Sequence, residues 1–190
     1  MSHPIHDSPA TLTYSLTTIG LHWFMAAALA ANFVLGLTMS DLALSPQKLQ
    51  FYSWHKWTGI TLLALVTLRL IWRVLARPPI FLAAPAWQQR AAQFSHLIMY
   101  LLMFAIPLSG WLMSSAGGFT VNYLGVLPLP DLVDKNKALF EQLKEVHEIL
   151  NFSLLAVVVI HIVAALKHHF MDKDATLRRM LPWIKSRSWD

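Results

Sequence analysis

Four long apolar stretches separated by polar segments dominate the pattern of this chain. They cover residues 20–39, 54–76, 91–113 and 146–168. Each is long enough to cross the hydrocarbon core of a bilayer, which takes about 20 residues in a helix. A backbone surrounded by lipid has to satisfy its hydrogen bonds internally, so such stretches form helices. The pattern therefore predicts an all-α membrane protein, a bundle of four transmembrane helices.

The segments between the spans also carry structural signals. Arg77 and the two prolines after it end the second span, and Pro107 predicts a kink inside the third. Residues 114–144 contain glycines, prolines and charges, so we expect a long ordered loop with a short amphipathic helix around 135–144. The tail, 172–190, is basic and amphipathic, and we expect it to lie along the membrane interface.

Composition agrees with this interpretation. The chain has 190 residues, of which 56% are hydrophobic and only 13% charged. There is room for about four spans and for no second sizeable domain, so we expect residues 1–190 to form a single domain. Cysteine is absent, which excludes a cysteine-ligated cluster and covalently attached c-type haem. The net charge of +5 does not indicate nucleic-acid binding, because the basic residues cluster beside the apolar spans.

The distribution of basic residues predicts the orientation in the membrane. With four spans, both termini lie on one side, and ten of the fifteen Lys and Arg residues belong to that side. Positively charged loops prefer the cytoplasm, so we predict that both termini are cytoplasmic.

Histidines on the fourth span point to the chemistry. His147 and His161 are fourteen residues apart, which on an α-helix is a rise of roughly 21 Å and nearly four full turns. Both side chains therefore share one face, at the two ends of a bilayer core about 30 Å thick. This arrangement suits two stacked haems, each held through its iron by imidazoles from two helices.

The other spans supply the partner imidazoles. On the outer side, His55 is the partner available to His147. On the cytoplasmic side, His161 has two possible partners, His22 and His96, and their spacing does not separate them. Both alternatives stay open on the residues alone.

Two glycines and an arginine lie at helical spacings that fit the two proposed haem positions. Glycine follows His22 and His96 after fourteen residues, at Gly36 and Gly110, where it leaves room for a flat macrocycle. Arg69 follows His55 at the same spacing, which places it to pair with a haem propionate. The alternative for Arg69 and for Arg73 is a role as positive-inside anchors.

His168 has two interpretations. It follows His161 by seven residues and shares its face at the cytoplasmic interface, where a protonatable group suits a quinone site. The alternative is a histidine that extends its polar end to the membrane surface.

Several motifs together resemble one family. The first three spans contain LHWF, WHKWTGI and FSHLIMYLLMFAIPLSGW, and the fourth ends in ALKHHFMDKDATLRRM. This combination, which covers nearly the whole chain, is similar to the prokaryotic cytochrome b561 family of small diheme cytochromes in the bacterial inner membrane.

The resemblance implies ligands and partners. It implies two non-covalent haem b groups with bis-histidine ligation, the outer held by His55 and His147 and the inner by His22 and His161. His96 would then lie beside a propionate. The resemblance also implies ubiquinone at the cytoplasmic end, where the candidates are Arg73, Arg77 and His168.

The predicted function is diheme transmembrane electron transfer from an outer-side donor, with superoxide as one candidate, to a membrane quinone. That is an oxidoreductase of the superoxide:ubiquinone or quinone-linked type. The alternative is a cytochrome b anchor subunit that conducts electrons for a partner dehydrogenase. A metal-binding transporter is disfavoured, because few acidic residues lie at membrane depth and two ligand sets suit a stacked electron path.

Overall fold

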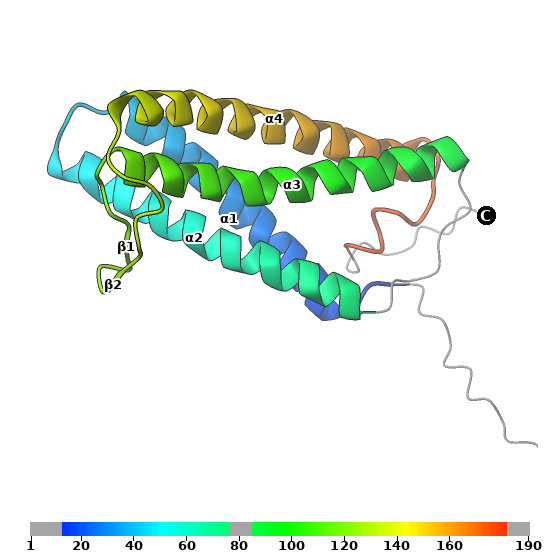
Figure 1. Ribbon diagram of the computed structural model, residues 1–190. Helices are drawn as coiled ribbons and strands as arrows, with labels where there is room; N and C mark the ends of the chain where they lie inside the picture. Colours follow the sequence, from blue (N-terminus) through cyan, green and yellow to red (C-terminus); the bar gives the residue numbers. More distant parts are fainter. Residues whose placement is uncertain (1–12, 77–84, 182–190) are drawn as a thin grey trace, which may run out of the picture.

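Long helices make up most of the chain in a computed structural model that describes residues 13–76 and 85–181. The described helices are α1 (Leu16–Asp41), α2 (Pro46–Leu75), α3 (Ala86–Ala116) and α4 (Lys137–Phe170) (Figure 1). Each of the four is long and apolar enough to cross a membrane. The predicted fold class, a four-helix transmembrane bundle, is confirmed.

Polar caps extend the helices beyond the predicted spans. The hydroxyls of Ser15 and Ser45 accept hydrogen bonds from backbone amides in the first turns of α1 and α2, and Asn136 does the same for α4. The short amphipathic helix predicted around 135–144 is not a separate element. From Lys137 it forms the first turns of α4, because the sequence has no glycine or proline between the Asn136 cap and the span.

The helices pack as two pairs. α1 lies against α2, α3 lies against α4, and α2 also contacts α3. α1 approaches α4 through aromatic rings, such as Phe33 and Phe152, whose centroids are 5.9 Å apart. Large apolar side chains such as Val159 stay exposed on the outside of the bundle, as expected where lipid is the solvent. Histidines of α1 and α2 face α4 across the inside of the bundle.

The two ends of the bundle differ. A short antiparallel hairpin of β1 (Asn122–Tyr123) and β2 (Leu127–Pro128) lies at one end, which we call the hairpin end (Figure 1). Its turn has Leu124 and Gly125 at positive φ, a conformation that matches strand twist in tight hairpins. The indole Nε1 of Trp57 donates to Asn122 O at 2.7 Å and holds the hairpin against α2. The sequence indicated an ordered loop here but not the hairpin.

The described chain begins and ends at the opposite end, the terminal end. After α4, the chain forms turns up to Leu181, and Trp23 Nε1 donates to Met180 O at 2.8 Å. The first part of the predicted interfacial tail is thus held against α1. The rest of that tail, 182–190, and Arg77 lie outside the described residues.

Candidate functional site

Histidines face one another at two levels of the bundle. At the hairpin end, the rings of His55 on α2 and His147 on α4 have centroids 6.3 Å apart and planes at 81°. A ligating imidazole nitrogen lies about 2 Å from a first-row metal ion, so two rings on opposite sides of one ion have centroids about 6 Å apart. The spacing of this pair fits one iron between the two rings.

Hydrogen bonds orient both rings at the hairpin end. His147 Nδ1 lies 2.9 Å from Ser109 Oγ, whose own proton is donated to Ile106 O at 2.8 Å, so the hydroxyl accepts from Nδ1–H. His55 Nδ1 lies 3.2 Å from Asn32 O, a carbonyl that can only accept. Each ring therefore carries its proton on Nδ1 and keeps the Nε2 lone pair for a metal, which is the usual arrangement of metal-binding histidines.

Glycines leave space for these rings. A Cβ added at Gly36 would lie 3.2 Å from His55 Cε1, and one at Gly110 would lie 3.1 Å from His147 Cε1. Both contacts are tighter than ordinary van der Waals packing. The sequence predicted that the two glycines lie at this level, and they do; the groups that they make room for in the structure are the imidazole rings of His55 and His147.

At the terminal end, His161 on α4 faces two histidines. Its ring centroid is 6.5 Å from that of His22 on α1 and 5.6 Å from that of His96 on α3. The interplanar angles, 65° and 64°, are nearly equal. The structure therefore keeps both possible partners of His161, namely His22 and His96. The three rings form one cluster.

Arg69 enters this cluster from α2. Its Nη2 donates to His22 Nδ1 at 3.2 Å and its Nε donates to Tyr100 OH at 3.3 Å. Its Nη1 is buried and has no hydrogen-bond partner among the described residues. A buried guanidinium donor without a partner fits an anionic group, and the propionate of a haem is such a group.

The Arg69 contact also bears on the His22 tautomer. Arginine can only donate, so His22 Nδ1 accepts and the ring proton lies on Nε2 in this arrangement. Ligation of iron through either ring nitrogen of His22 therefore requires the contact with Arg69 to open. The residues present fit haem at both levels, directly at the hairpin end and after this rearrangement at the terminal end.

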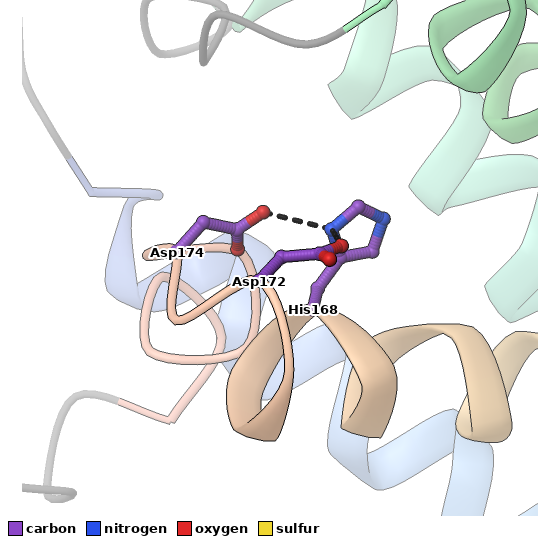
Figure 2. A group of neighbouring side chains, drawn as sticks. All are labelled: His168, Asp172 and Asp174. Carbon is purple, nitrogen blue, oxygen red and sulfur yellow. Dashed lines mark hydrogen bonds and ion pairs between the residues drawn. The ribbon is translucent and has the colours of Figure 1, made fainter.

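Two further predicted residues, Arg73 and His168, make other contacts at the terminal end. The Arg73 guanidinium lies over the Tyr100 ring, 5.6 Å from its centroid. His168 Nδ1 lies 2.8 Å from Asp174 Oδ2 and 3.1 Å from Asp172 Oδ2, so this nitrogen is held by carboxylates just beyond α4 (Figure 2).

Asp174 anchors the turn after α4, and its charge makes that anchor pH-dependent. Burial raises the pKa of Asp174, but hydrogen bonds from Thr176 and His168 outweigh it and hold the pKa below its ordinary value. The stabilisation is thus present above the ordinary carboxyl pKa of about 3.9 and is lost as the pH falls through the lowered value.

The Thr176 amide donates to Asp174 Oδ1 at 2.8 Å. We expect its hydrogen-exchange protection to fall as the pH drops through the lowered pKa of Asp174. Asp174→Asn should lower the protection at neutral pH and remove its acid dependence, whereas Asp41→Asn should change neither. Protection that stays constant through the acid range in the unsubstituted protein would contradict this assignment.

Sequence reasoning missed the residues that orient the rings. Ser109 and the Asn32 carbonyl contact the imidazoles, and Tyr100 accepts from Arg69; histidine spacing reveals none of these contacts. A usable signal was present for Ser109, because it is a polar residue next to Gly110 inside an apolar span.

A four-helix membrane bundle with facing imidazoles at two levels and no cysteine is the arrangement expected of a membrane cytochrome of the b type. Comparison with known proteins shows the family. Residues 13–183 match the family model described as prokaryotic cytochrome b561. The chain therefore belongs to the prokaryotic cytochrome b561 family, which confirms the resemblance found in the sequence and brings b-type haem binding and electron transfer in the membrane.

Curated relatives cover nearly the same length. Cytochrome b561 homolog 2 of Escherichia coli is 35% identical over 176 residues, 88% of this chain and 90% of the relative. Cytochrome b561 homolog 1 of the same organism is 33% identical, over 89% of this chain and 97% of the relative. The probable superoxide oxidase CybB of Yersinia pestis is 29% identical over 174 residues, 89% of this chain and 96% of the relative.

Proposed function

We propose that this cytochrome holds two b haems and carries electrons across the bacterial inner membrane. His55 and His147 ligate the haem at the hairpin end, and His22 and His161 ligate the haem at the terminal end. The observation that carries the proposal is that an imidazole of another helix faces α4 at each level, with ring centroids 6.3 Å apart at His147 and 6.5 Å apart at His161, a spacing that suits one iron. The choice of His22 over His96, whose ring lies 5.6 Å from that of His161, follows the family resemblance.

The direction across the membrane follows from charge. Of the fifteen Lys and Arg residues, five belong to the hairpin end: Lys48, Lys56, Lys135, Lys137 and Lys144. Of the other ten, the seven that lie among the described residues belong to the terminal end, which we therefore place in the cytoplasm. The hairpin end then faces outward and receives the electron donor.

The donor and acceptor that we propose are superoxide and a membrane quinone, as in an oxidoreductase of the superoxide:ubiquinone type. A relative of similar length is named a probable superoxide oxidase, which supports superoxide. Five lysines and six Asp and Glu residues belong to the hairpin end, so attraction of a small anion would have to be local, for example at Lys56 next to His55. Such an attraction should weaken as salt is added. Ubiquinone at the cytoplasmic end accepts the electrons.

The chain's own residues set up this transfer. Haem supplies the one-electron redox chemistry when bound. Ser109 and the Asn32 carbonyl orient the two imidazoles at the hairpin end, and Arg69 offers its free Nη1 to a propionate at the terminal end. The helices exclude water and keep the two sites at fixed levels.

A pyridine haemochrome assay on the purified protein, with a reduced-minus-oxidised spectrum, tests the proposal. We expect two b haems per chain, reduced when superoxide is generated enzymatically and reoxidised when decylubiquinone is added. Superoxide dismutase should abolish the reduction. A haem content near one per chain would exclude the two-site arrangement, and reduction that dismutase does not affect would exclude superoxide.

Replacing His22 and His96 separately should decide between the two partners of His161. We expect His22→Leu to lose the terminal-end haem, because in the proposed arrangement His96, whose ring lies 5.6 Å from that of His161, is not a ligand. His96→Leu should retain two haems with a shifted midpoint potential. Haem content and a redox titration measure both effects. The opposite result, loss of a haem only in His96→Leu, would assign the ligand to α3.

The anchor-subunit function is the second candidate, and one observation favours it. The hairpin turn exposes apolar side chains, with Leu124 55% and Val126 81% exposed, which is a surface that a partner protein could cover. Quinone reduction by the purified cytochrome alone, with superoxide as the donor, would exclude this candidate. Quinone reduction only when a dehydrogenase copurifies would establish it.

A further inference from the structure

A groove of about 310 Å³ opens between α2 and α3 in the terminal half of the bundle. Its apolar wall includes Leu70, Leu97 and Leu101, which are 38%, 54% and 56% exposed. These exposed leucines lie within the apolar membrane-spanning helices, so the mouth of the groove faces lipid. A hydrophobic molecule dissolved in the bilayer can reach the groove without crossing water.

Hydrogen-bonding groups gather in the same groove. Gln93, His96 and Tyr100 are three and four residues apart and so share one face of α3, and Arg73 reaches them from α2. All four side chains can donate hydrogen bonds. An apolar pocket with a few convergent polar groups is the usual form of a small-molecule site. Because the polar groups here can donate, they suit a ligand that carries carbonyl oxygens.

The groove shares His96 with the histidine cluster but lies on the side away from the proposed ligands' helices. His96 lines the groove and also packs on His161, with ring centroids 5.6 Å apart. Tyr100 lines the groove and accepts a hydrogen bond from Arg69, which reaches His22. The residues that line the groove come from α2 and α3, whereas the proposed ligands His22 and His161 come from α1 and α4.

We propose that this groove binds the head group of the membrane quinone, which enters sideways from the lipid between α2 and α3. His96 and Tyr100 donate hydrogen bonds to its carbonyl oxygens, and the isoprenoid tail leaves past the exposed leucines. The inference rests on the proposed function, which names a quinone as the acceptor, and adds where the quinone binds.

This placement differs from the one that the sequence suggested at His168. The Nδ1 of His168 is held by the carboxylates of Asp172 and Asp174, and the turn that carries them is anchored after α4 (Figure 2). In contrast, Arg73 already lies over Tyr100 inside the groove. Of the residues first considered for quinone binding, the groove keeps Arg73 and replaces His168 by His96 and Tyr100.

A photoreactive azido derivative of decylubiquinone, used on the haem-loaded protein in lipid nanodiscs, tests the proposal. After illumination, the labelled peptides are mapped by mass spectrometry, with and without excess decylubiquinone. We expect displaceable labelling of residues 93–104 in α3. Displaceable labelling confined to residues 168–181 would overturn the groove and leave the proposed function intact. Absence of displaceable labelling anywhere would overturn the groove together with the quinone acceptor.

Matched substitutions on α3 sharpen the test. Leu101→Trp fills the groove and should weaken decylubiquinone binding at least about tenfold. Phe94→Trp is the control, since Phe94 is similarly exposed (65%) on the same helix but does not line the groove. Tyr100→Phe removes one donor, keeps the ring under Arg73 and should weaken binding about three- to tenfold.

Haem content and the absorption spectrum are measured for each variant to verify that the sites are intact. Equal binding by Leu101→Trp and Phe94→Trp, with both haems retained, would overturn the proposal. If the edge of a haem fills the groove, the two variants should also bind decylubiquinone equally, and the proposal would be overturned.

Discussion

His147→Leu is expected to lose about half of the haem absorbance of the cytochrome, because leucine offers no lone pair to iron and His55 is left without a partner. The haem at the terminal end should remain, since His22 and His161 are untouched. The pyridine haemochrome assay should give about one haem per chain, and reduction by superoxide should fall to the uncatalysed background.

His169→Leu is the control for this substitution. His169 also lies on α4, in its last turn, where its ring packs on Phe170 with centroids 4.8 Å apart. This variant should keep two haems and normal reduction. If His147→Leu retained both haems, the ligand pair at the hairpin end would be wrong.

Gly110→Leu should produce the same loss without touching a ligand. Even a Cβ at this position would lie 3.1 Å from His147 Cε1, so a leucine has to displace the ring and close the space beside it. We expect about one haem per chain, together with a lower thermal stability of the holoprotein, because bound haem stabilises the folded state.

The matched control is Gly20→Leu on α1. Gly20 is exposed and a Cβ there meets nothing within 4 Å, so the same substitution should leave the haem content and spectrum unchanged. Loss of haem in both variants would mean that glycine flexibility matters in general. Loss in neither would mean that His147 is not held against Gly110.

Much of the architecture was predictable because it depends on local properties of the chain. Apolar runs of sufficient length predicted the four membrane helices, which the structure confirms. The helix ends were placed less well: α4 begins at Lys137, ahead of the predicted span, because the polar cap Asn136 lies outside the apolar run. The hairpin at Asn122–Pro128 was missed, since its strands are too short for an alternating pattern.

The part of the site that depends on spacing along a single helix was predictable, and the contacts between helices were not. The spacing of His147 and His161 placed both on one face of a helix, and each indeed faces a histidine of another helix. The contact between Arg69 and His22 joins residues 47 positions apart on different helices, and spacing along one helix says nothing about it. The assignment of the four ligands remains a prediction, which the histidine substitutions test.

The sequence by itself determined the four spans, the absence of cysteine-based chemistry and the two levels of histidine, because hydropathy and helical rise are properties of single segments. The tertiary structure alone decided which groups meet across helices. It brought His22 and His96 together at His161, oriented His147 on Ser109 and opened a groove beside His96. These contacts depend on the rotation and crossing of packed helices, which no single segment encodes.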